Sequence, residues 1–185
     1  MFIESNRGCS ALKYSPNGDF LVTVFSGEHS SNNSINTTSR VILFNTKTYS
    51  AIATFVGHHE LVYEISWDNE NVEFVTSSAD FTAKVWSVNT MKTDNSEDGQ
   101  MFPGGSNDGS IVPLKAELTL QHPCFVYTSC FHPRNGGTTA KGWPKIIITG
   151  AYDRSVRLWN RYAIFQIGET CAFTNSIYRF IKITV

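Results

Sequence analysis

Two sets of four residues repeat along the chain with types and spacings that could support chemistry. In each set an Asp stands four positions after a Thr, and a Trp stands six positions after the Asp. Thr, His and Asp are together the residue types of a nucleophile relay, in which a base activates a hydroxyl. The fourth member is an indole N–H donor, however, and repetition of a whole set is typical of a scaffold device. The two sets are His58, Thr76, Asp80 and Trp86, and His122, Thr149, Asp153 and Trp159.

The chemistry that these residues share is the satisfaction of buried polar groups. The Asp carboxylate can accept a hydrogen bond from the imidazole, the imidazole can reach the Thr hydroxyl, and that hydroxyl can accept from the indole N–H. Each set would thereby connect three strands and a loop. We therefore interpret both sets as structural tetrads, and we predict no catalytic residue and no enzymatic activity.

A second group of residues resembles a metal site when it is read along the sequence. His122, Cys124, Cys130 and His132 lie within one short stretch. In an extended strand, at about 3.3 Å per residue, the two cysteines lie on the order of 20 Å apart. They then cannot share a zinc ion or form a disulfide. We predict no metal site, no cofactor, and reduced cysteines, with Cys124 and Cys130 inside the fold.

The elements that position the tetrads are short strands separated by turns. The stretch 61–67 alternates apolar and polar residues, as a half-buried strand does. The distance from His to Thr is 18 positions in the first set and 27 in the second, because a hydrophilic insert around residues 134–144 lengthens the second. The predicted strands are 61–67, 73–77, 82–88 and 116–121 around the first tetrad, and 125–131, 145–150, 155–159 and 162–167 around the second.

A weaker copy of the same pattern precedes these two. A strand ends at Tyr14, a turn through SPNGD follows, and Thr23 stands nine positions after Tyr14. Phe44 takes the place of the Trp, and Thr38 takes the place of the Asp. This copy is therefore predicted to lack the polar network.

Repetition at this length predicts an all-β fold of propeller blades. Propellers close with at least four blades, so three blades predict an incomplete, open propeller fragment. The predicted division is a partial propeller domain over residues 1–167 and an unassigned tail over 168–185, with blade 1 at about 8–56, blade 2 at about 57–121 including an insert at 89–113, and blade 3 at about 122–167.

The stretches GHHELVYEISW, TSSADFTAKVW, HPCFVYTSCFHP and ITGAYDRSVRLW together resemble the WD40 domain of the jouberin family, over roughly residues 8–160. The resemblance implies a WD-repeat scaffold for protein–protein interaction that acts in cilium assembly and transition-zone organisation. It further implies partners of the tectonic-type transition-zone complex and nephrocystin, and a location at the ciliary basal body and transition zone, beside the ciliary cytoskeleton.

Two other classes of function stay open at this point. One is another WD40 adaptor, such as a ubiquitin-ligase substrate receptor or a G-protein-β-like signalling module, which would carry a docking motif or an N-terminal helix. The other is a hydrolase or metalloenzyme, which would need acidic or His residues at the mouth of the channel. Outside the tetrads, the innermost strands offer only Glu64 and His132.

Charge and hydropathy limit which partners and which cellular compartment we expect for the chain. A net charge of −1 gives no basic field for nucleic acid. No run of 18 apolar residues exists, and the first residues, MFIESNRG, lack the pattern of a signal peptide. We therefore expect a cytoplasmic protein without nucleic-acid partners and without direct membrane insertion.

Propellers bind partners through loops at the rim and at the channel mouth. The loops predicted to share one face here are 56–59, 78–81, 120–125 and 151–154. An alternative interpretation is that these are ordinary turn residues. The candidate protein-binding residues on this face are His59, Glu60, Phe81, Tyr152 and Arg154.

Overall fold

The computed structural model describes residues 8–26, 39–88, 113–133 and 145–160. These residues form strands and turns, and among them no helix is long and apolar enough to cross a membrane. The strands are β1 (Cys9–Tyr14), β2 (Phe20–Phe25), β3 (Ser39–Asn45), β4 (Ala51–His58), β5 (Val62–Trp67), β6 (Glu73–Ser78), β7 (Thr82–Ser87), β8 (Pro113–Leu114), β9 (Leu118–Gln121), β10 (Val126–Phe131), β11 (Ile146–Ala151) and β12 (Val156–Asn160).

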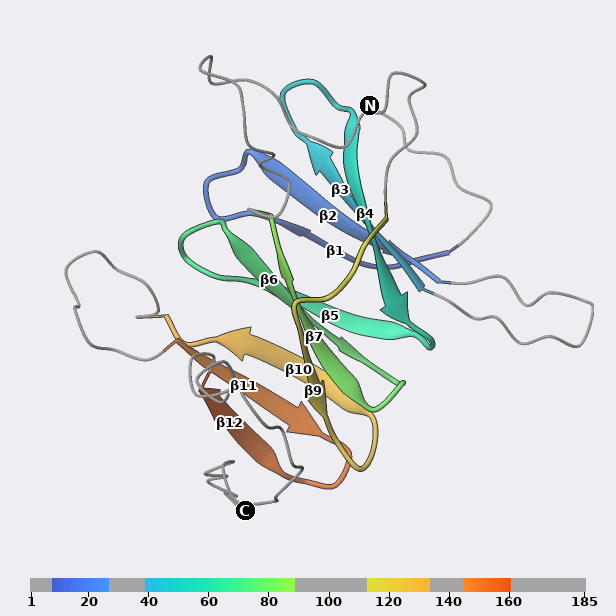
Figure 1. Ribbon diagram of the computed structural model, residues 1–185, viewed down its shortest axis with the longest axis vertical. Coiled ribbons are helices and arrows are strands. Elements are labelled where there is room, and N and C mark those ends of the chain that lie inside the picture. The colour runs from blue at the N-terminus through green and yellow to red at the C-terminus, as the bar shows by residue number, and fades with distance from the viewer. Residues whose placement is uncertain (1–7, 27–38, 89–112, 134–144, 161–185) are drawn as a thin grey trace, which may run out of the picture.

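The strands form three sheets that follow one another along the chain, and the all-β prediction is confirmed. Their strand orders are β1-β2-β3-β4-β8, β5-β6-β7-β9 and β10-β11-β12, and we refer to these sheets as blades 1, 2 and 3. Within each blade, strands that are consecutive in sequence pair antiparallel. Figure 1 shows the three sheets side by side from blue to orange, with the first strands β1, β5 and β10 in contact between blades.

The three blades share one register, which explains why their sequences repeat. Thr23, Thr76 and Thr149 each lie in the second strand of a blade and pair with residues of the first and third strands. Two positions earlier in the second strand, each blade pairs an apolar residue with the large aromatic of the third strand. These aromatics are Phe44, Trp86 and Trp159.

Strand β8 departs from the pattern that the sequence predicts. Pro113, the last residue of the predicted insert of blade 2, and Leu114 pair in parallel with Thr54 and Phe55 of β4. They add a fifth strand to the outer edge of blade 1. Proline is tolerated there because one side of an edge strand has no neighbouring strand to which an N–H would have to donate. The predicted outer strand of blade 2 is shorter than expected, since only Leu118–Gln121 pairs with β7.

Several of the predicted segments lie outside the described residues. They are Thr38, most of the insert at 89–113, the insert around 134–144, the strand at 162–167 and the tail at 168–185.

Hydrophobic side chains pack between the blades and form two cores. Phe55 of β4 meets Phe74 of β6 and Trp86 of β7, with ring centroids 5.1 Å and 5.5 Å apart. Trp67 of β5 reaches back to stack on Phe20 of blade 1 at 6.3 Å. Burial of large apolar side chains is the main favourable contribution to folding, so each blade depends on its neighbour. The core between blades 2 and 3 comprises Val75, Ala83, Val85, Leu120, Val126, Phe131, Ile147 and Trp159.

A buried ion cluster also joins blade 3 to blade 2. The Lys145 ammonium lies 2.8 Å from Asp68 Oδ2 and 3.0 Å from Glu73 Oε2, and all three side chains are nearly inaccessible to solvent. Burial lowers the pKa of Lys145, but the hydrogen bond to Asp68 and the charge of Glu73 raise it by more, so the net pKa lies above the ordinary value. The lysine therefore stays charged and links the two blades.

The Lys145 cluster yields a test of coupling between the blades. Substituting Lys145 by Ala should cost about 3–5 kcal/mol of unfolding free energy, because it leaves two buried carboxylates without their cation. Lys47 provides the matched control, since it pairs with Asp19 at 2.9 Å on the surface, and its loss should cost about 0–1 kcal/mol. Urea denaturation of both variants checks the difference, and equal losses would contradict the assigned role of Lys145.

Candidate functional site

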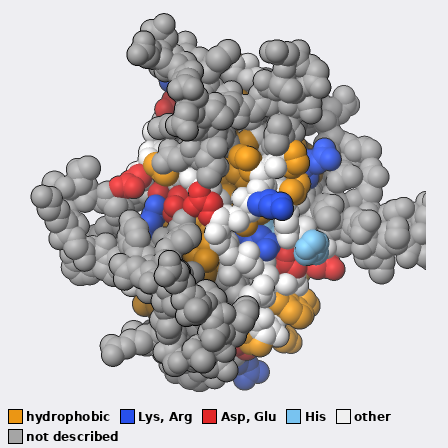
Figure 2. Space-filling model, in the orientation of Figure 1, with side chains coloured by type: hydrophobic (Ala, Val, Ile, Leu, Met, Phe, Trp, Pro, Cys, Tyr) orange, Lys and Arg blue, Asp and Glu red, His pale blue; other side chains and the backbone are white. Residues whose placement is uncertain are grey.

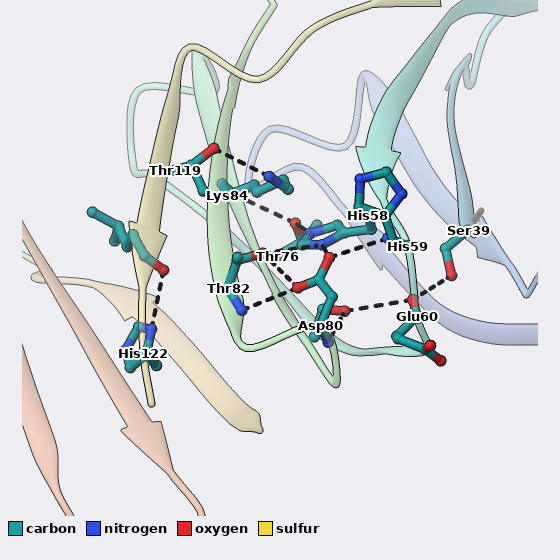
Figure 3. A network of polar contacts seen from close by, with 12 residues as sticks. Ser39, His58, His59, Glu60, Thr76, Asp80, Thr82, Lys84, Thr119 and His122 are labelled. Carbon is teal, nitrogen blue, oxygen red and sulfur yellow. Dashed lines mark hydrogen bonds and ion pairs between the residues drawn. The ribbon is translucent and has the colours of Figure 1, made fainter. Parts of the chain in front are cut away.

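The first tetrad forms a continuous chain of hydrogen bonds through blade 2. His58 Nδ1–H donates to Asp80 Oδ2 at 2.7 Å, and His58 Nε2 accepts from the Thr76 hydroxyl at 2.6 Å. The Thr76 oxygen in turn accepts from Trp86 Nε1–H at 2.8 Å. These roles correspond to the neutral imidazole with its proton on Nδ1. Figure 3 shows His58, Thr76 and Asp80 converging from the end of β4, from β6 and from the turn before β7.

Local backbone geometry turns His58 into the blade. The preceding residue, Gly57, has a φ of 148°, a conformation that residues with a Cβ rarely adopt. A Cβ at Gly57 would also lie 3.6 Å from the Trp86 ring. The Gly-His pair at the end of β4 is therefore a requirement of the backbone as well as of the hydrogen-bond network.

Asp80 organises the turn between β6 and β7 while it orients the imidazole. Its Oδ1 accepts from the Thr82 amide at 3.0 Å and from the Thr82 hydroxyl, and its Oδ2 also accepts from the His59 amide at 3.1 Å. Burial raises the pKa of Asp80, but the hydrogen bonds from His58 and Thr82 outweigh it and hold that pKa below the ordinary value. Burial likewise lowers the pKa of His58, against the influence of Asp80. The pair is therefore a neutral imidazole on an ionised carboxylate.

The second tetrad is built differently, and the expected contact between His122 and Asp153 is wrong. His122 Nε2 accepts from the Thr149 hydroxyl at 2.8 Å, and Thr149 accepts from Trp159 Nε1–H at 2.9 Å, as in blade 2. His122 Nδ1–H donates instead to the Leu120 carbonyl at 3.0 Å. Burial lowers the pKa of His122 to about 4, and the nearby Arg157 cation contributes to the shift.

Arg157 explains why Asp153 is not available to the histidine. The Arg157 guanidinium forms an ion pair with Asp153, whose Oδ1 also accepts from the Ser155 amide at 3.1 Å. The guanidinium holds the pKa of Asp153 below its ordinary value. Lys84 lies at the same register position in blade 2, but its ammonium donates to Thr119 at 3.1 Å and leaves Asp80 to His58. A planar guanidinium can hold a carboxylate through two bonds, which an ammonium cannot.

Blade 1 has the threonine without the rest of the network, as the sequence predicts. Thr23 is 4% exposed, and its hydroxyl has no hydrogen-bond partner in the described part of the chain. Phe44 occupies the position of the tryptophan and offers no donor. The buried hydroxyl of Thr23 is therefore unpaired within these residues, whereas the equivalent hydroxyls of Thr76 and Thr149 are paired in blades 2 and 3.

The tetrads are unsuited to catalysis because their hydroxyls are sealed inside the blades. Thr76 and Thr149 are 0% exposed, so neither oxygen can reach a substrate. Glu64, the acidic residue of the innermost strands, accepts from the Ser129 amide of blade 3 at 3.2 Å and so connects blades 2 and 3. His132 lies just after β10, where its amide bonds to the Ile146 carbonyl.

The cysteines are only partly where the sequence places them. Cys124 is partly buried, and its Sγ accepts from the Asp153 amide at 3.1 Å. Cys130 is exposed, so the expectation that it lies inside the fold is wrong; β10 is the innermost strand of blade 3, and Cys130 faces away from the packed core. Over the four described ranges, no cluster of three or more potential metal ligands occurs.

The loops of the candidate face are tied together by backbone hydrogen bonds. In blade 2 the Ala79 amide donates to the Leu61 carbonyl at 2.8 Å, and in blade 3 the Tyr152 amide donates to the Phe125 carbonyl at 2.9 Å. The His122 amide donates to the Phe81 carbonyl at 2.9 Å, next to the last pair of β7 and β9, and so fixes the segment that leads from blade 2 to blade 3. All five candidate residues, His59, Glu60, Phe81, Tyr152 and Arg154, are exposed.

Two of the five candidates belong to a line of aromatic rings that the sequence did not reveal. Phe81 contacts Phe125 at 5.3 Å between ring centroids, and Phe125 contacts Tyr152 at 6.2 Å. Tyr152 then contacts Tyr127 at 6.2 Å, and Tyr127 contacts Tyr63 at 5.2 Å. We call these five residues the aromatic cluster. Figure 2 shows hydrophobic side chains exposed at the lower right, the end at which β7 begins and β9 ends in Figure 1.

A repeated β-bulge aims the two strand tyrosines at this face. Tyr63 is the extra residue between Val62 and Glu64 in β5, and Tyr127 is the extra residue in the matching place of β10. A bulge leaves one residue unpaired and redirects its side chain. The recurring Val-Tyr of LVYEISW and FVYTSCF was the available signal in the sequence.

Comparison with known proteins identifies the repeats. The family model described as WD domain, G-beta repeat matches residues 49–87 and 115–160. These segments are WD40 repeats. Two solved propellers are similar in fold. The Cps50 (Swd1) β-propeller domain of Myceliophteria thermophila has a TM-score of 0.54 and 14% identity, over 85% of this chain and 37% of that one. The Dos1 propeller has a TM-score of 0.56 and 15% identity, over 86% of this chain and 32% of that one. The prediction of open WD40 propeller blades is confirmed.

The resemblance to the jouberin family is confirmed as well. Jouberin of Rattus norvegicus and Jouberin of Mus musculus are each 26% identical to this chain over 92% of its length. The chain spans 14% of the length of these relatives.

Substitution by valine tests whether the threonine hydroxyls of blades 1 and 2 differ in hydrogen bonding as described. Thr76→Val should cost about 1–3 kcal/mol, because it leaves the buried His58 and Trp86 nitrogens without their partner. Thr23→Val in blade 1 should be neutral or stabilising, since the hydroxyl that it removes has no partner. Thermal unfolding of both variants measures the contrast. A larger loss for Thr23→Val than for Thr76→Val would disprove the assignment.

Acidification should destabilise the protein from about pH 6.5 downward. The pKa of His122 is 6.5 in the unfolded chain and about 4 in the folded blade, so the unfolded state binds more protons between these values. The stability that neutral His122 contributes is therefore present above pH 6.5 and is lost as the pH falls toward 4. His58 acts in the same direction, because its pKa is lowered too. The urea midpoint should decrease from pH 7 to pH 5.

Arg157→Gln provides the matched variant for this pH dependence. It removes a nearby cation and releases the Asp153 carboxylate, so the pKa of His122 should rise above about 4. Titration of the His122 ring by NMR measures the shift. An unchanged or lower value would show that Arg157 does not control the imidazole.

Proposed function

We propose that this chain is part of a non-enzymatic WD40 scaffold that binds other proteins through the face bearing the aromatic cluster. The observation that carries the proposal is the contrast between the two kinds of conspicuous residue. The His, Thr and Trp side chains of the polar tetrads, which include residue types of a catalytic site, are buried. The aromatic rings lie outside, with Phe81 43%, Tyr127 45% and Tyr152 65% exposed. Exposed contiguous aromatic surface is typical of protein-binding sites.

The similarity to Jouberin supports a more specific role for the intact protein. We propose that it acts in cilium assembly and in organisation of the transition zone, at the cytoplasmic base of the cilium. The partners that this role implies are the tectonic-type transition-zone complex and nephrocystin. The partial WD40 domain of residues 1–167 would contribute one binding face to that assembly.

The net charge of the chain and the composition of the aromatic cluster agree with a protein partner. A net charge of −1 favours neither a phosphate backbone nor an anionic membrane surface. The cluster itself is uncharged and combines aromatic faces with three tyrosine hydroxyls. Such residues supply large contact areas at a small cost in side-chain entropy.

Proximity labelling in ciliated cells tests this function. The labelled protein should recover transition-zone components, and Tyr152→Ala should reduce that recovery because Tyr152 is the most exposed ring of the cluster. Tyr49→Ala is the control, since Tyr49 is 62% exposed but lies between β3 and β4, away from the cluster. Recovery of cullin or G-protein subunits in place of transition-zone proteins would instead favour another class of WD40 adaptor.

A further inference from the structure

Neighbouring blades pack through two different surfaces, because alternate residues of a strand lie on opposite sides of its sheet. The first hydrophobic core joins one side of blade 1, which we call its trailing face, to one side of blade 2, which we call its leading face. The trailing face of blade 1 includes Val22, Val41 and Leu43. The leading face of blade 2 includes Ile65, Trp67 and Phe74.

The second hydrophobic core repeats this contact one blade further along the chain. The trailing face of blade 2, with Val75, Ala83 and Val85, packs against the leading face of blade 3, with Phe131 and Ile147. These residues have the same positions as those of the first core, because the first three strands of each blade pair in one register. Both interfaces therefore place a trailing face on the leading face of the next blade.

Blade 1 has a leading face that none of the described blades covers. Tyr14 in β1 has the register position of Trp67 in β5, and two positions earlier Leu12 has that of Ile65. Trp67 and Ile65 are 7% and 4% exposed, whereas Tyr14 and Leu12 are 58% and 61% exposed. Two large apolar side chains at positions that fill an interface elsewhere in the chain are thus exposed to solvent.

Blade 3 has the complementary surface, a trailing face without a described neighbour. Ile148, Val156 and Leu158 have the register positions of the three trailing-face residues of blade 2. The blade 2 residues are completely buried, whereas Val156 is 36% exposed and the other two are partly exposed. The chain therefore has one half of the blade interface at its first blade and the other half at its last described blade.

We propose that a second copy of this chain covers both surfaces, with the leading face of blade 1 in each copy packed on the trailing face of blade 3 in the other. The two open surfaces have the register and the apolar character of the two sides of the interfaces already present. Joining them buries Leu12 and Tyr14, and burial of large apolar side chains is the main driving force of association. The contact is head-to-tail, so every copy uses both of its surfaces.

The number of blades selects two copies. Propellers close with about four to eight blades. Three blades from each of two copies make six, whereas three copies would make nine. A pair of copies is therefore the assembly of this kind that closes within the range of known propellers, and closure leaves no leading or trailing face uncovered.

The edge of the first interface indicates which residue Tyr14 meets in the second copy. Phe20 in blade 1 stacks on Trp67 of blade 2, with ring centroids 6.3 Å apart. Ile146 in blade 3 has the register position of Phe20 and is also apolar. Because Tyr14 has the position of Trp67, the proposed contact places Tyr14 of one copy against Ile146 of the other.

Light scattering after size-exclusion chromatography of the 185-residue chain, over a dilution series, tests the proposal. The mass should be twice the 20.7 kDa of one chain and should fall toward that value on dilution. A mass of one chain at every concentration would overturn the proposal, and so would a mass of three or more chains.

Glutamate substitutions locate the interface. Leu12→Glu and Val156→Glu should each weaken association about tenfold or more, because each places an unpaired charge in the contact. Leu61→Glu is the matched control, since Leu61 is 42% exposed but lies in the loop before β5, outside both faces. Leu12 and Val156 are exposed within one copy, so the near-ultraviolet circular dichroism of each variant should match that of the dissociated unaltered chain. Association that neither variant weakens would refute the assigned surfaces.

Mixing the two glutamate variants distinguishes a head-to-tail contact from one that uses the same surface twice. Val156→Glu retains the leading face of blade 1, and Leu12→Glu retains the trailing face of blade 3. A mixture can therefore form one intact interface between unlike copies, and its mean mass should exceed that of either variant alone. A mixture that stays as dissociated as its components would contradict head-to-tail pairing.

This inference goes beyond the proposed scaffold function and depends on different residues. Tyr152→Ala should leave the mass of the chain unchanged, because Tyr152 belongs to the aromatic cluster and to neither open face. Loss of transition-zone labelling in Tyr152→Ala, together with a monomeric unaltered chain, would refute self-association and retain the scaffold function. A dimer that Leu12→Glu dissociates, together with labelling that is independent of Tyr152, would support self-association and refute the assigned binding face.

Discussion

Pairing of one buried threonine hydroxyl in the second strand of blades 2 and 3 is the constraint on which the rest of the structure depends. Thr76 and Thr149 are completely buried, and each accepts from a tryptophan and donates to a histidine. A buried hydroxyl without partners costs stability, so each tetrad couples the fold of the strands to the position of a loop histidine. The loops of the candidate face are thereby attached to the blade interiors. Blade 1 has no such coupling at Thr23.

The two tetrads show how one register position changes a network. Lys84 and Arg157 both stand opposite the tetrad threonine, four positions after the aspartate. The lysine reaches away to Thr119 and the arginine turns back to Asp153, so only blade 2 places a carboxylate on its histidine. His122 consequently relies on a backbone carbonyl, which is a weaker acceptor than a carboxylate. The choice between Lys and Arg at this register position therefore decides the hydrogen-bond partner of the imidazole.

Spacing along the sequence predicted what depends on register, and it failed where groups compete in space. Threonine, histidine and tryptophan meet as expected because their offsets are set by strand pairing and a tight turn. The partner of Asp153 was not predictable from spacing, since Arg157, Ser155 and His122 are all within reach of the turn. Strand β8 was missed for a related reason: two residues that pair in parallel with a distant strand have no periodicity of their own.

The aromatic cluster was missed because regular alternation is the wrong rule at a bulge. In a regular strand, side chains alternate between the two faces of the sheet, so the positions of Tyr63 and Tyr127 would be fixed by those of their neighbours in β5 and β10. The extra residue in each strand releases both tyrosines toward the loop face. Blade 1 has the same bulge with Ser10 as the extra residue, so the aromatic cluster begins at blade 2. The same repeated backbone defect thus yields either a small side chain or an exposed ring, and the choice of residue at that one position determines how far a binding surface extends around the blades.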